Sequence, residues 1–84
     1  MYYVYVLKSE KDSMFYVGYT SDLKRRFAEH SEGLVKSTKH RRPLEIVYYE
    51  ASRDHRDAMK RERYLKTAYG KRYIKNRLKN DLVG

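Results

Sequence analysis

The 84-residue sequence contains no cysteine, so disulfide bridges and cysteine-ligated metal sites are both excluded. It has no apolar segment long enough to cross a membrane, since the longest apolar run covers only residues 1–7. The N-terminus also lacks a basic region followed by a long apolar run, which is the pattern of a secretory signal. We therefore expect a cytoplasmic protein with no membrane association.

The length sets a second limit, because 84 residues correspond to a single domain, which we place at residues 1–84. A domain of this size buries a small core. The sequence has no internal repeat or interdomain linker. Aliphatic residues are few, so many of the ten tyrosines must contribute to the core.

The chain carries an excess of positive charge, with 20 Lys and Arg against 11 Asp and Glu and a formal net charge of +9. Such a charge on a small surface favours a polyanionic partner, namely DNA, RNA or an anionic membrane. The ten tyrosines and two phenylalanines favour nucleic acid among these, because aromatic faces can stack on exposed bases. Solubility alone is the simpler explanation of the charge.

Residues 2–7 and 15–19 are rich in Val and Tyr and predict two β-strands. The polar segment 8–13 between them predicts a hairpin with a longer loop. A loop centred on this segment pairs Tyr5 with Tyr16 and Tyr3 with Gly18. We then expect Tyr5 and Tyr16 side by side on one face, and an open space at Gly18 that a backbone or ligand could approach.

A helix is predicted over residues 22–32, with Thr20 or Ser21 as N-cap and Gly33 as its end. Helical periodicity places Arg26 and His30 on the flank of the buried stripe, one turn apart, whereas Arg25 points away. Arg26 can equally be an arginine that lays its stem along the surface. The alternative interpretation of His30 is a helix-end histidine that interacts with the helix C-terminal dipole.

The second half of the chain predicts a basic connector (33–42), a strand (44–49), a helix (53–68) that stops at Gly70, and a short basic helix (71–79). The connector is either a phosphate-contacting segment or a solvated loop.

In the strand, Leu44, Ile46 and Tyr48 should share one face, with Glu45, Val47 and Tyr49 on the other. The stripe of apolar residues on the long helix consists of Ala58, Leu65 and Tyr69.

Glu62 falls on this same stripe, within an otherwise basic stretch. A carboxylate on a core-facing side is costly to desolvate unless it has a partner. One interpretation is an i,i+4 ion pair with Lys66 on the helix surface. The other is a ligand for a hard divalent cation, because Mg²⁺ is commonly held by one or two carboxylates together with phosphates and water.

The motif Tyr3-Val4-Tyr5, followed after ten residues by Tyr16-Val17-Gly18, resembles the paired motif of the GIY-YIG nuclease family. Arg26, His30 and Glu62 follow in the order and spacing of the family's further site residues. The length and pattern are most similar to small single-domain bacterial members, which resemble the nuclease domain of the nucleotide-excision-repair incision subunit.

The resemblance implies an α+β fold, a three-stranded antiparallel sheet flanked by three helices in the order β-β-α-β-α-α. It also implies a metal-dependent endonuclease that hydrolyses phosphodiester bonds in DNA, with structure-selective or weakly sequence-specific action in repair or processing. Glu62 would hold Mg²⁺ or Mn²⁺, and Arg26 would stabilise charge on the phosphate. Tyr5 would be the general base, with its pKa lowered by Arg26 and the metal, while Tyr16 and His30 position water or phosphate. His30 is the alternative base.

Supporting roles are implied for four further residues: Gly18, Ser37, His40 and Asn76. The sequence departs from the family at Ser37, where many members carry Tyr or His, and His40 lies three residues later. This departure keeps an alternative open, a non-catalytic basic nucleic-acid-binding module with the same fold. DNA is the expected partner ahead of RNA, and a repair protein is a further candidate partner.

Overall fold

Three antiparallel strands form the centre of the computed structural model, which describes residues 1–83. The sheet order is β2-β1-β3, with β1 at Tyr2–Ser9, β2 at Phe15–Thr20 and β3 at Leu44–Ser52. The helices are α1 (Leu23–Ser31), the 3₁₀ helix η1 (Lys39–Arg41), α2 (His55–Leu65), α3 (Ala68–Arg77) and α4 (Lys79–Val83). The predicted α+β class and β-β-α-β-α-α order are thus confirmed, with η1 and α4 as short additions.

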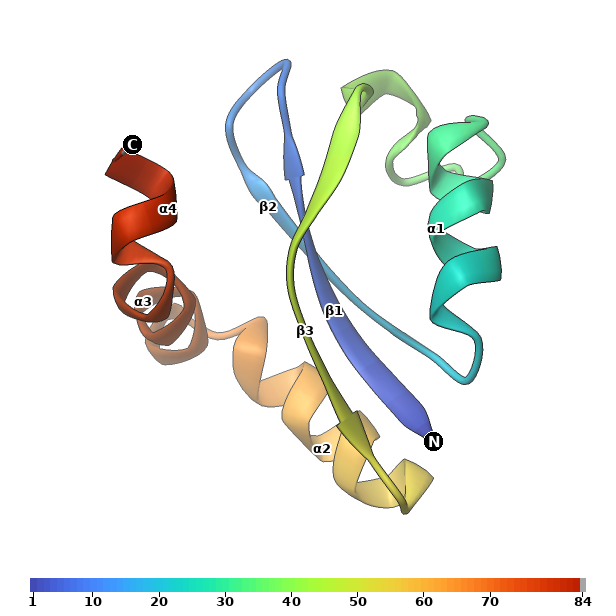
Figure 1. Ribbon diagram of the computed structural model, residues 1–84, viewed down its shortest axis with the longest axis vertical. Helices are drawn as coiled ribbons and strands as arrows, with labels where there is room; N and C mark the ends of the chain where they lie inside the picture. The colour runs from blue at the N-terminus through green and yellow to red at the C-terminus, as the bar shows by residue number, and fades with distance from the viewer. Residues whose placement is uncertain (84) are drawn as a thin grey trace.

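The sheet is covered on both faces, by α1 on one side and by α2 and α3 on the other (Figure 1). Alternation along β1 supplies both cores, because successive side chains of a strand point to opposite faces. Val4 and Val6 pack with Ala58, Leu65 and Ile74 on the α2–α3 side. On the α1 side the buried residues are Tyr5, Leu7 and Leu44. Within residues 1–83, none of the helices combines the length and apolarity that crossing a bilayer requires.

The hairpin register differs from the prediction by two residues. Tyr5 lies opposite Gly18, and Leu7 lies opposite Tyr16. The strands extend further toward the tip than expected, because the amide of Ser9 donates to the Met14 carbonyl at 3.0 Å and its hydroxyl accepts from two loop amides. A shift of two preserves the face of every side chain, so Tyr5 and Tyr16 still share the α1 side, as diagonal neighbours.

A β-bulge in β3 makes both predicted faces wrong, because Tyr48 and Tyr49 each lie on the face opposite to the one expected. Val6 pairs with Tyr48 but Leu7 pairs with Ile46, so Val47 is an extra residue between them. An extra residue reverses the alternation beyond it. Ile46 therefore packs on the α1 side, whereas Tyr48 packs in the core on the α2–α3 side.

Helix α1 begins one residue later than expected, because Asp22 is the N-cap in place of Thr20 or Ser21. Its carboxylate accepts a hydrogen bond from the Arg25 amide at 3.1 Å. The predicted end at Gly33 is confirmed, since Gly33 has a φ of 78°. The Leu34 amide donates to the Glu29 carbonyl at 2.9 Å, which closes a Schellman motif.

The predicted helix 53–68 is shorter than expected, and Gly70 does not end it. Helix α2 stops at Leu65, and Thr67 caps α3 by accepting a hydrogen bond from the Gly70 amide at 3.1 Å. Gly70 is buried inside α3, where a Cβ would collide with the backbone at Tyr64 and Leu65. Because the helix breaks before it, Tyr69 leaves the apolar stripe and is 69% exposed.

Candidate active site

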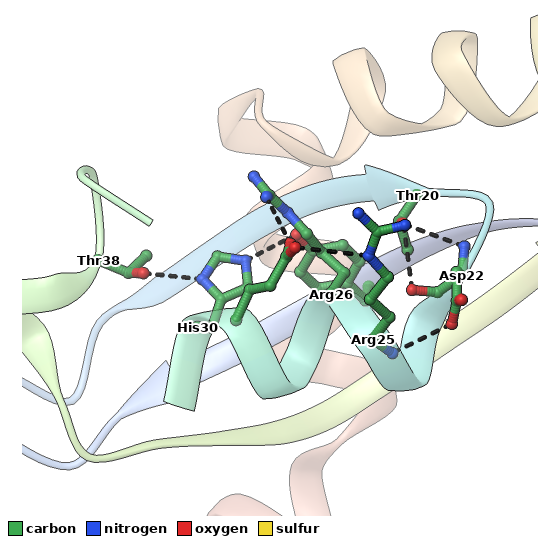
Figure 2. A network of polar contacts seen from close by, with 8 residues as sticks. Thr20, Asp22, Arg25, Arg26, His30 and Thr38 are labelled. Carbon is green, nitrogen blue, oxygen red and sulfur yellow. Dashed lines mark hydrogen bonds and ion pairs between the residues drawn. The ribbon is translucent and has the colours of Figure 1, made fainter. Parts of the chain in front are cut away.

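A chain of three buried polar side chains crosses the α1 side of the sheet. The Tyr5 hydroxyl lies 2.8 Å from Nε2 of His30. Nδ1 of His30 lies 2.7 Å from Oγ1 of Thr38 (Figure 2). Tyr5, His30 and Thr38 are each at most 1% exposed. In a neutral imidazole one ring nitrogen donates and the other accepts, so these two contacts together fix the orientation of the ring.

Each member of this chain comes from a different part of the fold, namely β1, the last turn of α1, and the loop before η1. The Schellman motif at Gly33 turns the chain back along α1, and the Thr38 amide then donates to the Val35 carbonyl at 3.1 Å. Sequence reasoning missed Thr38. No spacing marks it, because its place depends on a loop that folds back over eight residues to reach His30.

Gly18 supports the site by making room for Tyr5. A Cβ on Gly18 would collide with the phenol of Tyr5, at its hydroxyl and the carbon that carries it. The expected open space therefore exists, but the protein's own Tyr5 fills it, and Gly18 lies opposite Tyr5 and not opposite Tyr3. A strand glycine at such a position permits close approach.

Tyr16 completes an aromatic group with Tyr5 and His30. Its ring centroid lies 6.5 Å from that of Tyr5 and 5.2 Å from that of His30, with tilted or edge-on geometry. Such arrangements are the preferred ones for aromatic pairs. Tyr16 is only partly buried, so the aromatic group reaches the surface at this residue.

Arg26 and Arg25 differ in the way that helical periodicity predicts. The Arg26 side chain is 37% exposed and that of Arg25 is 76% exposed. Arg26 pairs with Glu29 at 3.0 Å and also interacts with the phenol of Tyr5. Figure 2 shows His30 between Thr38 on one side and the two arginines of α1 on the other. The site thus holds one guanidinium against the sheet and one in solvent.

Burial raises the pKa of the Tyr5 phenol above its ordinary value. The neighbouring Arg26 acts in the opposite direction, as the sequence predicts, but burial outweighs it, and the charges of Tyr16 and Glu62 also favour the protonated phenol. The expected direction of the Arg26 effect is therefore confirmed, although among the protein's own groups burial raises the pKa of Tyr5 on balance. At neutral pH Tyr5 is a neutral phenol in this structure.

Burial, and to a lesser extent the positive charge of Arg26, lowers the pKa of His30 to about 4. The imidazole is therefore neutral at pH 7. An imidazolium stabilised by the helix C-terminal dipole, one of the two sequence interpretations, is not what the structure holds. A neutral ring can accept a hydrogen bond from Tyr5 and can also take a proton.

Glu62 approaches from α2 on the opposite side of the sheet, and its charge still reaches the phenol of Tyr5. Its side chain is 22% exposed and lies 3.4 Å from Nζ of Lys66, so the i,i+4 pair is present. Within residues 1–83, no group of three or more His, Cys, Asp or Glu side chains is placed to hold a metal ion. One accessible carboxylate fits a hydrated hard cation such as Mg²⁺, which takes its other ligands from water and phosphates.

The other expected supporting residues lie outside this group. Ser37 and His40 are exposed in the loop, where the His40 backbone carbonyl accepts a hydrogen bond from Lys11 at 3.2 Å. Asn76 is exposed on α3. In the part of the chain that the structure describes, none of the three hydrogen-bonds to Tyr5, His30 or Arg26. Thr38 occupies the position that Ser37 was expected to hold.

Comparisons with known proteins identify the family of the chain and a solved structure with a similar fold. Residues 1–79 match the family model described as the GIY-YIG catalytic domain. A UPF0213 protein of Clostridium perfringens is 42% identical over 67 residues, covering 79% of this chain and 71% of the relative. One of Staphylococcus haemolyticus is 43% identical over 67 residues, covering 79% and 80%. The solution NMR structure of a UPF0213 protein from Bacillus halodurans superposes with a TM-score of 0.55 at 33% identity, covering 88% of this chain and 82% of that one.

Proposed function

The chain belongs to the GIY-YIG family, and from this premise we propose that it is a metal-dependent endonuclease that hydrolyses phosphodiester bonds in DNA, with structure-selective or weakly sequence-specific action. The observation that carries the proposal is the 2.8 Å contact between the Tyr5 hydroxyl and the buried neutral His30, beside the guanidinium of Arg26. A hydroxyl, a proton acceptor and a phosphate-binding group are the components that such hydrolysis requires.

Tyr5 and His30 act together as a proton relay in this proposal. When His30 carries its hydrogen on Nδ1, Nε2 accepts the hydrogen bond from the Tyr5 hydroxyl, and the phenol oxygen can accept one from a water. As the attacking water gives its proton to Tyr5, the phenol gives its own proton to His30. This relay combines the two alternative bases and avoids the need for a free phenolate, which burial disfavours.

Substrate binding also favours the relay, through Arg26. The positive charge of Arg26 is one cause of the low pKa of His30. A phosphodiester beside Arg26 would offset this charge, so the pKa of His30 would rise and the imidazole would accept a proton more readily. The forked guanidinium fits two phosphate oxygens and stabilises the charge that develops at phosphorus. Tyr16, at the open side of the aromatic group, would orient the water or the phosphate.

Glu62 is the residue that would hold the cation, Mg²⁺ or Mn²⁺. Bound there, the cation would neutralise charge on the phosphate and assist departure of the leaving oxygen. Lys66 is the competing partner of the carboxylate at 3.4 Å. A pair that is partly exposed contributes little stability, so Lys66 can give way.

A non-catalytic nucleic-acid-binding module is the second candidate. It is favoured by the raised pKa of Tyr5, which keeps the phenol protonated, and by the ion pair of Glu62 with Lys66, which occupies the carboxylate. In this case the +9 charge would bind nucleic acid without cleavage. The choice of DNA over RNA, a role in repair and a repair-protein partner are predictions that accompany the nuclease proposal.

Cleavage of labelled single-stranded, duplex, flap and branched DNA, and of single-stranded RNA, tests the proposal with Mg²⁺, Mn²⁺ or chelator. We expect metal-dependent cutting that Glu62→Gln and Tyr5→Phe abolish without loss of binding. Glu45→Gln is the matched control, because Glu45 is exposed near the start of β3. Binding without cutting on all substrates in both metals would leave the binding module as the function.

A further inference from the structure

Helices α2 and α3 present a surface of tyrosines and arginines that the proposed chemistry does not use. Its members, here called the α2–α3 aromatic strip, are Arg61, Tyr64, Tyr69, Arg72 and Tyr73. Tyr69 is 69% exposed, Tyr64 is 41% exposed and Tyr73 is 37% exposed. Figure 1 shows α2 and α3 following one another along the side of the sheet opposite α1, the helix that carries Arg26 and His30.

Guanidinium groups lie over the rings of the strip. The Arg61 guanidinium lies 5.3 Å from the ring centre of Tyr64 and 4.8 Å from that of Tyr73. That of Arg72 lies 5.6 Å from the ring centre of Tyr69. Cation–π contacts of this kind hold planar groups face to face. Each of the two guanidinium groups therefore lies over at least one tyrosine ring of the strip.

A hydrogen bond to the sheet holds Arg61, which contacts two of the three rings of the strip. Nε of Arg61 donates to Oε1 of Glu50 at 2.8 Å, which ties α2 to β3. Tyr69 and Tyr73 are four residues apart on α3, so they lie on neighbouring turns of one helix face. A rigid row of exposed rings loses little conformational entropy when a planar ligand stacks on it.

The charge around the strip selects an anionic partner. Residues 60–79 hold nine of the 20 Lys and Arg of the chain but only one acid, Glu62. Exposed aromatic rings within a basic surface are the combination that binds unpaired nucleotides, where rings stack on bases and cations contact the phosphates. A duplex hides its base faces, so it could use only the charges.

We propose that the α2–α3 aromatic strip is a binding surface for single-stranded nucleic acid, separate from the Tyr5–His30 site. The inference goes beyond the proposed function, because binding at this surface requires no cleavage. The sugar makes little difference to stacking, so single-stranded DNA and RNA share the chemistry, and the experiment compares both.

Fluorescence anisotropy with labelled oligo(dT), oligo(rU) and a duplex, in chelator, tests the proposal in the full chain. Tyr69→Ala should weaken single-strand binding by about fivefold or more, since loss of one stacked base costs about 1 kcal/mol or more. Duplex binding should stay unchanged, and Tyr69→Phe should bind as the wild type does. Tyr49→Ala is the matched control, because Tyr49 is 55% exposed on β3 and packs against Tyr3.

Arg72 provides a second variant that does not depend on Tyr69. Arg72→Lys should keep the salt dependence of binding but lower the affinity, because lysine keeps the charge and loses the planar group. Arg72→Gln should lower the affinity and, because it removes the charge, should reduce the salt dependence of binding as well. Circular dichroism verifies that each variant is folded.

Three results would overturn the proposal: unchanged single-strand affinity in Tyr69→Ala, an equal loss in Tyr49→Ala, or an equal loss for duplex. Binding to phosphatidylserine vesicles that depends on Tyr69, in the absence of Tyr69-dependent oligonucleotide binding, would also overturn it. These outcomes are independent of cleavage. A protein that never cuts but binds oligo(dT) through Tyr69 keeps this inference and loses the proposed function.

Discussion

The phenol of Tyr5 occupies the space in which a side chain at Gly18 would stand. The two residues are direct partners across the β1–β2 ladder, and a Cβ on Gly18 would collide with the Tyr5 ring at its hydroxyl end. The glycine thereby lets a buried strand tyrosine lie flat across its neighbour and meet His30 at 2.8 Å. The position of the hydroxyl in the site depends on the absence of a side chain 13 residues later in the sequence.

Gly18→Ala should therefore reduce both stability and activity. The added methyl group overpacks a site with little freedom, which costs about 1–3 kcal/mol, and it displaces the Tyr5 hydroxyl from His30. Urea denaturation measures the first effect. In a Tyr5→Val background the same substitution should cost much less, and an equal cost in both backgrounds would contradict the collision with Tyr5.

Thr38→Val should lower kcat and leave KM nearly unchanged. Valine keeps the shape of threonine but removes the partner of Nδ1 of His30, so the ring loses its fixed orientation while the phosphate-binding residues stay in place. An unpartnered buried polar atom should also cost about 1–3 kcal/mol of stability. Thr38→Ser keeps the hydroxyl and should recover most of kcat. If Thr38 had only a structural role, both variant proteins would instead be less stable than the wild type, and kcat would show no selective change.

The stability of the fold should fall as the pH drops from about 6.5 toward 4. His30 has a pKa of about 4 in the folded protein and an ordinary value of 6.5. The unfolded chain therefore binds the proton more readily, so the stability from this group is complete above pH 6.5 and decreases below it. The loss amounts to at most about 3 kcal/mol, because one pKa unit corresponds to about 1.4 kcal/mol.

Urea denaturation of wild type and His30→Gln at a series of pH values isolates this contribution. Glutamine does not titrate in the range, so the difference between the two proteins should decrease on acidification. A difference that stays constant between pH 6.5 and 4 would falsify the depressed pKa of His30.

Arg26→Lys and Arg25→Lys form a matched pair of adjacent substitutions. Lysine keeps the charge but not the forked geometry of the guanidinium. Arg26→Lys should therefore reduce cleavage by about 100-fold or more, as typical loss of a group that stabilises transition-state charge does. Arg25, whose side chain is 76% exposed, should tolerate the change. Equal rates for the two variants would show that charge alone matters on this helix.

The predictions from sequence succeeded where a local pattern determines the structure. Short runs rich in Val and Tyr predicted β1 and β2, and helical periodicity distinguished Arg26 from Arg25. Gly33 marked the end of α1 because a positive φ favours glycine. These features depend on neighbouring residues alone, so their signal is contained in a short stretch of sequence.

The features that sequence reasoning missed depend on contacts between distant segments. The hairpin register was set by the hydrogen bonds of Ser9 at the tip, and not by the centre of the polar loop. Thr38 reaches His30 only after the chain has reversed direction. The balance between burial and Arg26 at Tyr5 likewise requires a three-dimensional structure, because desolvation depends on what covers the phenol.

The bulge at Val47 limits how the length of β3 can change. Beyond this one extra residue, Tyr48 faces the α2–α3 core, whereas Leu44 and Ile46 before it face α1. Deletion of a single residue between Ile46 and Tyr48 would exchange the two faces for everything that follows it. We therefore expect that insertions and deletions in relatives of this protein avoid the middle of β3, where a change of one residue would turn core side chains toward the wrong face of the sheet.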